Sequence, residues 1–157
     1  MPFARLLPLV LLVGASADTA AADATRSTGP VFEAFGPVFE GVEPEYMPPT
    51  DRYRAIFDVW KGPDDAATPN ARLATLARFM NYNARAGIAP EQISLALVLH
   101  GAAGRAALRN ASYREHFGVD HPDLALLEAL TARGVRILYC GQSAAARGYA
   151  RDEMITP

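Results

Sequence analysis

Residues 135–143 of this 157-residue chain read VRILYCGQS. The β-branched and aromatic side chains from Val135 to Tyr139 favour a short strand. The only cysteine of the chain, Cys140, follows at once, and Gly141 then opens a polar and Ala-rich segment. This order predicts a strand, a tight turn and the start of a helix, with a thiol at the turn. Because the N-terminus of a helix carries unpaired N–H groups that stabilise a thiolate, we expect the function to centre on Cys140.

Two other strand-like segments precede this stretch. The segment from Tyr53 to Trp60, with the sequence YRAIFDVW, is the first expected strand and ends at a Gly-Pro turn. The segment from Ile93 to Leu99 is almost continuously apolar, which is typical of a strand buried on both faces of a parallel sheet.

Helical patterns separate these strands. One helix is expected to begin at Thr68, which suits the cap position, and to end at Gly87. A short helix is expected over residues 105–111, a loop over residues 113–120, and a further helix from Pro122 to Gly134. Alternating strands and helices predict an α/β fold with a parallel sheet and right-handed crossovers.

The carboxyl ends of the three expected strands carry Trp60, His100 and Cys140. Ligands of such sheets bind at this edge. If the last two strands pair, His100 can approach Cys140 and either accept its proton or stabilise its thiolate; a purely structural role for His100 in the loop is the alternative. Small residues from Gly101 onward predict a turn with close backbone approach. Asn81, beside the apolar stripe of the first helix, is either a helix-edge residue or one that orients a site above the sheet.

The N-terminal part predicts export. Residues 1–24 have the features of a secretory signal peptide: Arg5, an apolar run from Leu6 to Val13 that is too short to span a membrane, and small residues suited to cleavage. A retained anchor or a misassigned start codon is the alternative. In an exported protein a single cysteine is a free reactive thiol, an intermolecular bridge or an inert buried residue.

An extended, Gly- and Pro-containing arm is expected over residues 25–50, before a domain at residues 51–157. The arm repeats the sequence GPVFE at residues 29–33 and 36–40. Its prolines argue against a helix or a central strand. Either its Val and Phe side chains pack on the domain or on a neighbouring subunit, or it is a disordered linker.

Several classes of function receive no support. A net charge of −2 gives no reason to expect nucleic-acid binding. The residues His100, His116, His121 and Cys140 lack the spacing of a zinc site. There is no Gly-x-Ser-x-Gly elbow of a hydrolase, and no metal or organic cofactor is expected.

The most specific motifs are LVLHGAA at residues 97–103 and CGQS at residues 140–143, supported by RFMN at residues 78–81 and LRN at residues 108–110. Together they resemble the DsrE/DsrF-like family, and most closely its exported single-domain members, over about residues 35–157. The resemblance implies a three-layer α/β/α fold with a mainly parallel five-stranded sheet and assembly into trimers or hexamers. It also implies, for the sulfur-relay members, a persulfide carried on a cysteine just after a strand, a position that Cys140 matches.

One departure concerns the C-terminal elements. The family pattern continues with another helix and strand, whereas only three strands are expected here, so these elements are apparently missing. A truncated chain, or completion of the fold by a partner subunit, would account for the difference.

The leading hypothesis is therefore a periplasmic or secreted sulfur-handling protein, either a persulfide carrier or a sulfur-relay-like protein. Its partners would be a sulfur donor or acceptor protein, or small sulfur species, with no nucleic acid and no membrane span after signal removal. Cys140 and His100 would carry the chemistry; the expected ligand-binding residues are Gly101, Gly141, Gln142, Ser143, Asn81 and Trp60. The alternative is a non-enzymatic module for small-ligand binding or oligomeric assembly, in which Trp60, His100 and Cys140 hold a ligand or a subunit contact.

Overall fold

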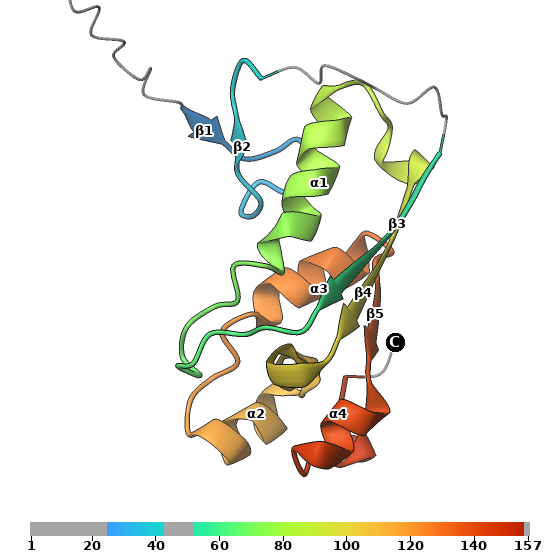
Figure 1. Ribbon diagram of the computed structural model, residues 1–157. Coiled ribbons are helices and arrows are strands. Elements are labelled where there is room, and N and C mark those ends of the chain that lie inside the picture. Colours follow the sequence, from blue (N-terminus) through green and yellow to red (C-terminus); the bar gives the residue numbers. More distant parts are fainter. Residues whose placement is uncertain (1–24, 43–51, 156–157) are drawn as a thin grey trace, which may run out of the picture.

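A computed structural model describes residues 25–42 and 52–155 and contains a three-stranded parallel sheet (Figure 1). The strands are β3 (Tyr53–Val59), β4 (Ile93–Leu99) and β5 (Arg136–Tyr139), in the order β3-β4-β5. Each expected strand is confirmed to within a residue or two of its ends. The central position of β4 is consistent with its nearly continuous apolar sequence, because both of its edges are paired and five of its seven residues are buried. The sequence-based prediction of an α/β fold with a parallel sheet is confirmed.

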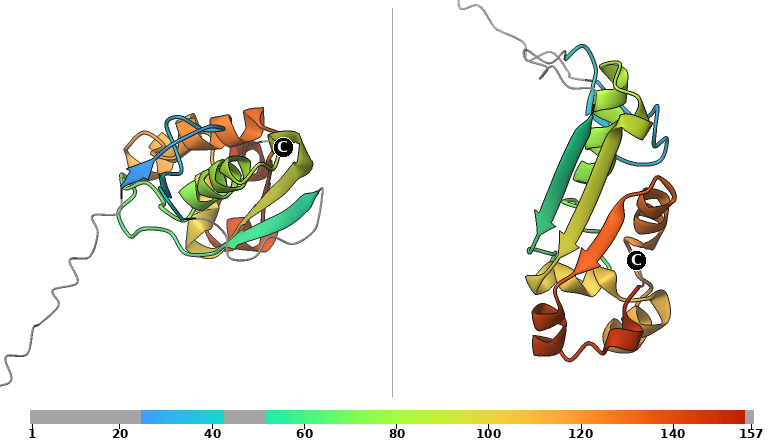
Figure 2. Two further views of the ribbon diagram at one scale, coloured as in Figure 1. Left: turned by 90° about the horizontal axis from the view of Figure 1, so that it is seen from above. Right: turned by 90° about the vertical axis from the view of Figure 1, so that its right-hand side faces the viewer.

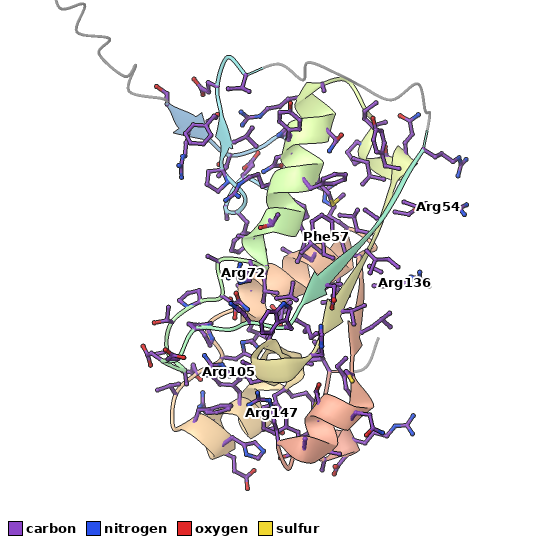
Figure 3. The ribbon with its side chains drawn as sticks, viewed as in Figure 1. Arg54, Phe57, Arg72, Arg105, Arg136 and Arg147 are labelled. Carbon is purple, nitrogen blue, oxygen red and sulfur yellow. The ribbon has the colours of Figure 1, made fainter. Side chains whose placement is uncertain are left out.

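Two helices pack on one face of the sheet and enclose the core. They are α1 (Ala74–Arg85) and α3 (Leu124–Ala132); in the right-hand view of Figure 2, α1 lies behind β3 and β4, and α3 lies beside β5. Phe57 of β3 points toward α1, where its ring meets that of Phe79 edge-on at 5.6 Å between centroids (Figure 3). Buried leucines from α1, α3 and β4 complete this core.

The first helix begins later than its sequence suggested. α1 starts at Ala74, and the Thr68 hydroxyl donates to a carboxylate oxygen of Asp65 instead of capping the helix. The intervening segment is fixed by tertiary contacts: the backbone N–H of Asn70 donates to the buried carboxylate of Asp123, 2.9 Å away. A contact across 53 positions of sequence overrides the local cap signal.

The region after β4 also differs from expectation. A 3-10 helix spans Gly101–Ala107 and α2 spans Asn110–Phe117, where a short helix and then a loop were expected. Tyr113 holds α2 in place, because its ring is buried and its hydroxyl donates to the Ala66 carbonyl at 2.8 Å. The remaining helices are a 3-10 turn at Pro90–Gln92, α4 (Gly141–Ala146) and a 3-10 turn at Arg151–Glu153.

The described part of the arm packs on the same chain. Its strands β1 (Arg26–Ser27) and β2 (Val38–Phe39) pair antiparallel beside α1 (Figure 1). The side chains of Val31, Phe32 and Val38 are buried. Residues 25–42 are therefore an ordered part of the fold and not a linker; the rest of the expected arm lies outside the described residues.

Asn81 of α1 anchors this arm. Its side-chain oxygen accepts the N–H groups of Val31 and Phe32 at 3.0 and 2.8 Å, and its amide nitrogen donates to the carbonyls of Phe32, Phe35 and Gly36. The side chain is fully buried. It thereby provides hydrogen-bond partners for backbone N–H and C=O groups of a loop that forms few backbone–backbone hydrogen bonds of its own.

The other face of the sheet carries no described helix. Arg54 of β3 and Arg136 of β5 point away from α1 into solvent (Figure 3). Ile56, Trp60 and Leu138 on this face are 72%, 56% and 39% exposed. The signal peptide expected at residues 1–24 lies outside the described residues, and within those residues no helix is long and apolar enough to cross a membrane.

Candidate functional site

The ladder between the strands continues past their carboxyl ends and aligns the expected site. The His100 N–H donates to the Val59 carbonyl at 3.1 Å, and the Cys140 N–H donates to the Leu99 carbonyl at 2.9 Å. His100 and Cys140 therefore leave neighbouring strands at the same edge, as the sequence predicted. The chain turns into α4 directly after Cys140, with the Ala144 N–H donating to the Cys140 carbonyl at 3.0 Å.

The Cys140 sulfur receives hydrogen bonds from the first turn of α4. The N–H and the hydroxyl of Ser143 and the N–H of Gln142 lower the pKa of the thiol, with the Ser143 N–H contributing most. These donors stabilise the thiolate more than the thiol, because a negative sulfur is the stronger acceptor. The residue is partly exposed and forms no disulfide.

Gly101 supports this arrangement from the neighbouring strand end. Its N–H donates to the Ser143 hydroxyl oxygen at 3.0 Å, and that hydroxyl in turn donates to the Cys140 sulfur. Donation in series strengthens each bond. Gly101 is also sterically required: its φ is +54°, and a Cβ there would lie 2.7 Å from the Trp60 carbonyl oxygen. The sequence predicted the close approach of the backbone at this turn, but not the hydrogen-bonded chain that it builds.

His100 takes a different partner from the one expected. Its Nε2 lies 2.5 Å from Oδ1 of Asp58 on β3 and is buried. The two atoms are at ion-pair distance without the alignment of a hydrogen bond. His100 is not among the groups that shift the pKa of Cys140. The imidazole thus lies at the edge that carries the thiol but contacts the strand on the other side.

Asp58 is the residue that sequence reasoning missed. It occupies an outward position of β3, two residues before Trp60 and four after Arg54. Period-two alternation along this strand would have placed all three side chains on one face. Only the pairing of β3 with β4, which aligns Asp58 with Val98, reveals that His100 can reach it.

The remaining predicted residues occupy different positions. Trp60 lies at the same edge and is exposed, with the Lys61 ammonium 4.7 Å from its ring centroid. Gly141 and Gln142 are exposed at the start of α4, and a Cβ on Gly141 would meet no other atom. Asn81 does not join this cluster, because its side chain is committed to the arm.

Beside the thiol turn lies a hollow of about 470 Å³, lined by Tyr139, Gly141, Ala144, Ala145, Tyr149 and Arg151. Two of these residues flank Cys140 directly in sequence. Among residues 25–42 and 52–155, no group of three His, Cys, Asp or Glu side chains is placed to hold a metal ion. His121 instead donates its Nε2–H to the Ala106 carbonyl and accepts the Asp123 N–H at Nδ1, as a buried structural residue.

These features define an α/β protein with a single partly exposed thiol at the carboxyl edge of a parallel sheet. A family model described as the DsrE/DsrF-like family matches residues 54–157, more than half of the chain. The chain belongs to this family, whose fold is related to sulfur relay. No curated protein and no solved structure matches the chain.

Proposed function

We propose that this protein handles sulfur outside the cytoplasm, carrying it as a persulfide on Cys140. The observation that supports this proposal most strongly is the environment of the thiol: it is partly exposed, and three donors from Gln142 and Ser143 lower its pKa. A thiol with these properties is a thiolate, and therefore a nucleophile, at a lower pH than an ordinary cysteine. Family membership supports the same chemistry.

The chemical cycle needs no cofactor. The Cys140 thiolate attacks the outer sulfur of a donor R–S–SH, forming a Cys–S–SH persulfide and releasing R–S⁻. An acceptor thiolate then attacks the outer sulfur of Cys140, takes it as its own persulfide and regenerates the Cys140 thiolate. Each step breaks one S–S bond and forms one, so no electrons are gained or lost overall. The donors that stabilise the thiolate also make Cys140 a good leaving group in the second step.

His100 and Asp58 would assist this cycle by proton transfer. An imidazole held by a carboxylate at the same strand edge can exchange protons with incoming donor or acceptor thiols. Trp60 and the hollow beside Gly141 offer room for the group that carries the sulfur. The donor and acceptor are a partner protein or small sulfur species.

Export and assembly are further parts of the proposal. The pattern of residues 1–24 supports cleavage of a signal peptide and a periplasmic or secreted location. The family resemblance supports a homo-oligomer, a trimer or a hexamer. Intact mass of the protein isolated from its native source is expected to show cleavage after one of the two small-residue sites, Ala15-Ser16-Ala17 or Ala22-Asp23-Ala24; a mature protein that retains both sites would refute export with cleavage.

Polysulfide loading tests the sulfur proposal. After brief treatment and desalting, mass spectrometry is expected to show a gain of one sulfur atom that cyanide or a thiol removes. Cys140→Ser should show no gain. Failure of the folded wild-type protein to gain sulfur would refute the carrier function.

A ligand-binding or assembly module is the second candidate. The exposure of Trp60 beside His100 favours it, because an aromatic ring at a strand end is a common ligand platform. It predicts that Cys140→Ser leaves binding and assembly unchanged.

A further inference from the structure

A cleft beside the carboxyl end of β3, hereafter the cationic cleft, gathers positive charge. It has a volume of about 620 Å³ and lies between the segment that leaves β3 and the start of α1, where Figure 3 labels Arg72. The polar residues that line it are Lys61, Thr68, Asn70, Arg72, Thr75 and Arg78. None of the described residues that line it is an aspartate or a glutamate. Because the net charge of the chain is −2, this gathering of three cations is a local feature and not a consequence of composition.

Two carboxylates contact residues of the cationic cleft without lining it. Asp65 accepts the Ala67 N–H at 3.0 Å and the Thr68 hydroxyl at 2.9 Å. Asp123 accepts the Asn70 N–H at 2.9 Å. Within the described part of the chain, none of the three cations of the cleft forms an ion pair with a carboxylate. Their positive charge is therefore available to a ligand.

The buried side chain of Asn70 joins the two segments that form the cationic cleft. Its amide nitrogen donates to the Lys61 carbonyl at 3.0 Å, and its oxygen accepts the Arg72 N–H at 3.1 Å. The backbone of Asn70 is itself held by its bond to the buried Asp123. The cleft is thus formed before any ligand arrives, which lowers the entropy cost of binding.

Arg78 is held in place with part of its guanidinium unused. Its Nε donates to the Pro37 carbonyl at 3.0 Å, and its two terminal nitrogens have no acceptor among the described residues. The exposed side chain of Arg72 likewise has no described acceptor. The Lys61 ammonium, 4.7 Å from the centroid of the Trp60 ring, adds a third positive charge. Guanidinium groups with unused N–H donors bind oxyanions through paired hydrogen bonds.

We propose that the cationic cleft binds a small molecule through a tetrahedral oxyanion group with at least two negative charges, such as a phosphate ester. A carboxylate offers two oxygens, whereas a tetrahedral group offers three or four to donors that surround it, here two guanidiniums, an ammonium and the Thr75 hydroxyl. The volume lies within the range of about 300–1,000 Å³ that is common for ligand pockets, so it has room for more than the oxyanion itself. This inference does not depend on the chemistry of Cys140.

Isothermal titration calorimetry of the mature protein with inorganic pyrophosphate tests this inference. The buffer is low in salt and free of phosphate and sulfate, because salt screens exposed charges. Titration at two temperatures ensures that a binding enthalpy near zero is not mistaken for absence of binding. We expect one site with a Kd of about 1 mM or lower. Acetate, which presents a single carboxylate, should bind at least about tenfold more weakly.

Two substitutions test whether the cationic cleft is the site. Arg72→Gln should raise the Kd for pyrophosphate about tenfold, and adding Lys61→Gln should raise it further. Both side chains are exposed, so these variants should fold normally, as circular dichroism can verify. Arg78 is less suitable because it also holds the arm. Arg136→Gln is the matched control, since it removes the same charge from the opposite face of the sheet (Figure 3) and should leave the Kd unchanged, as should Cys140→Ser.

A parallel titration with sulfate distinguishes the sources of the oxyanion. Tighter binding of pyrophosphate indicates a phosphate compound, and tighter binding of sulfate indicates an inorganic sulfur oxyanion; either result supports the inference if Arg72→Gln weakens it. The inference is overturned if neither anion binds up to about 10 mM. It is also overturned if acetate binds as tightly as pyrophosphate, or if Arg136→Gln weakens binding as much as Arg72→Gln, because the attraction would then belong to no particular site.

Discussion

The contact between Asn81 and the arm gives the sharpest test of how the fold is held together. The side chain makes five hydrogen bonds to the backbone of residues 31–36, and four of them are buried. Each buried bond contributes about 1 kcal/mol net, so Asn81→Ala should lower the free energy of unfolding by about 4 kcal/mol. That is a large fraction of the 5–15 kcal/mol that stabilises a typical domain.

The free energy with which the arm docks sets an upper limit on this loss of stability. If residues 25–42 detach when Asn81 is replaced, the cost cannot exceed the free energy with which the arm docks, chiefly through Val31, Phe32 and Val38. Urea denaturation should then show a lower midpoint, and limited proteolysis should cut within the arm before the domain unfolds. Asn81→Asp should be at least as damaging, because a second carboxylate oxygen would face three carbonyl oxygens.

Asn83 provides the matched control. It is buried on the same helix, but its side-chain nitrogen makes a single bond, to the Phe79 carbonyl at 2.7 Å. Asn83→Ala should cost about 1 kcal/mol. The reasoning is refuted if Asn81→Ala costs no more than Asn83→Ala, or if the arm stays protected from protease in the Asn81 variant.

Three further predictions follow from single contacts. Gly36→Ala should destabilise the protein by about 2 kcal/mol in thermal denaturation, because φ is +64° and a Cβ would lie 2.2 Å from the Arg78 backbone nitrogen; an unchanged midpoint would contradict this packing. Burial holds the pKa of His121 below its ordinary value of 6.5, so below that pH the unfolded chain binds a proton that the folded protein resists. Stability should therefore fall as the pH drops below 6.5, and His121→Asn should flatten the dependence in urea titrations; an equal slope in both proteins would count against it. Ser143→Ala removes a hydroxyl that bonds the Cys140 sulfur, so the pKa of the thiol should rise and its alkylation at neutral pH should slow; unchanged kinetics would show that the hydroxyl does not stabilise the thiolate.

The composition of short segments of the sequence was sufficient to predict the sheet. The apolar run of β4 and the β-branched run of β5 each encode one strand, and parallel pairing follows from the helices between them. The same logic placed Cys140, His100 and Trp60 at one edge. These features depend on local composition and on general rules of topology.

Contacts between distant residues were not predictable in this way. Asn81 reads as a helix-edge residue, and only the folded chain shows that it binds a loop nearly 50 positions earlier. α2 was missed because its polar sequence has little helical stripe of its own, and burial of Tyr113 stabilises it. The pairing of His100 with Asp58 depends on which strand lies next to β4, which a single sequence does not reveal.

Alkylation of Cys140 as a function of pH, in the folded and the urea-unfolded protein, tests the central claim most directly. The account predicts that the folded protein reacts at a lower pH than the unfolded chain, because the Ser143 and Gln142 donors lower the pKa of the thiol, and that polysulfide then adds one sulfur atom to the folded protein at Cys140. A thiol that reacts only after unfolding, or that titrates in the folded protein as it does in the unfolded chain and gains no sulfur, would contradict the account.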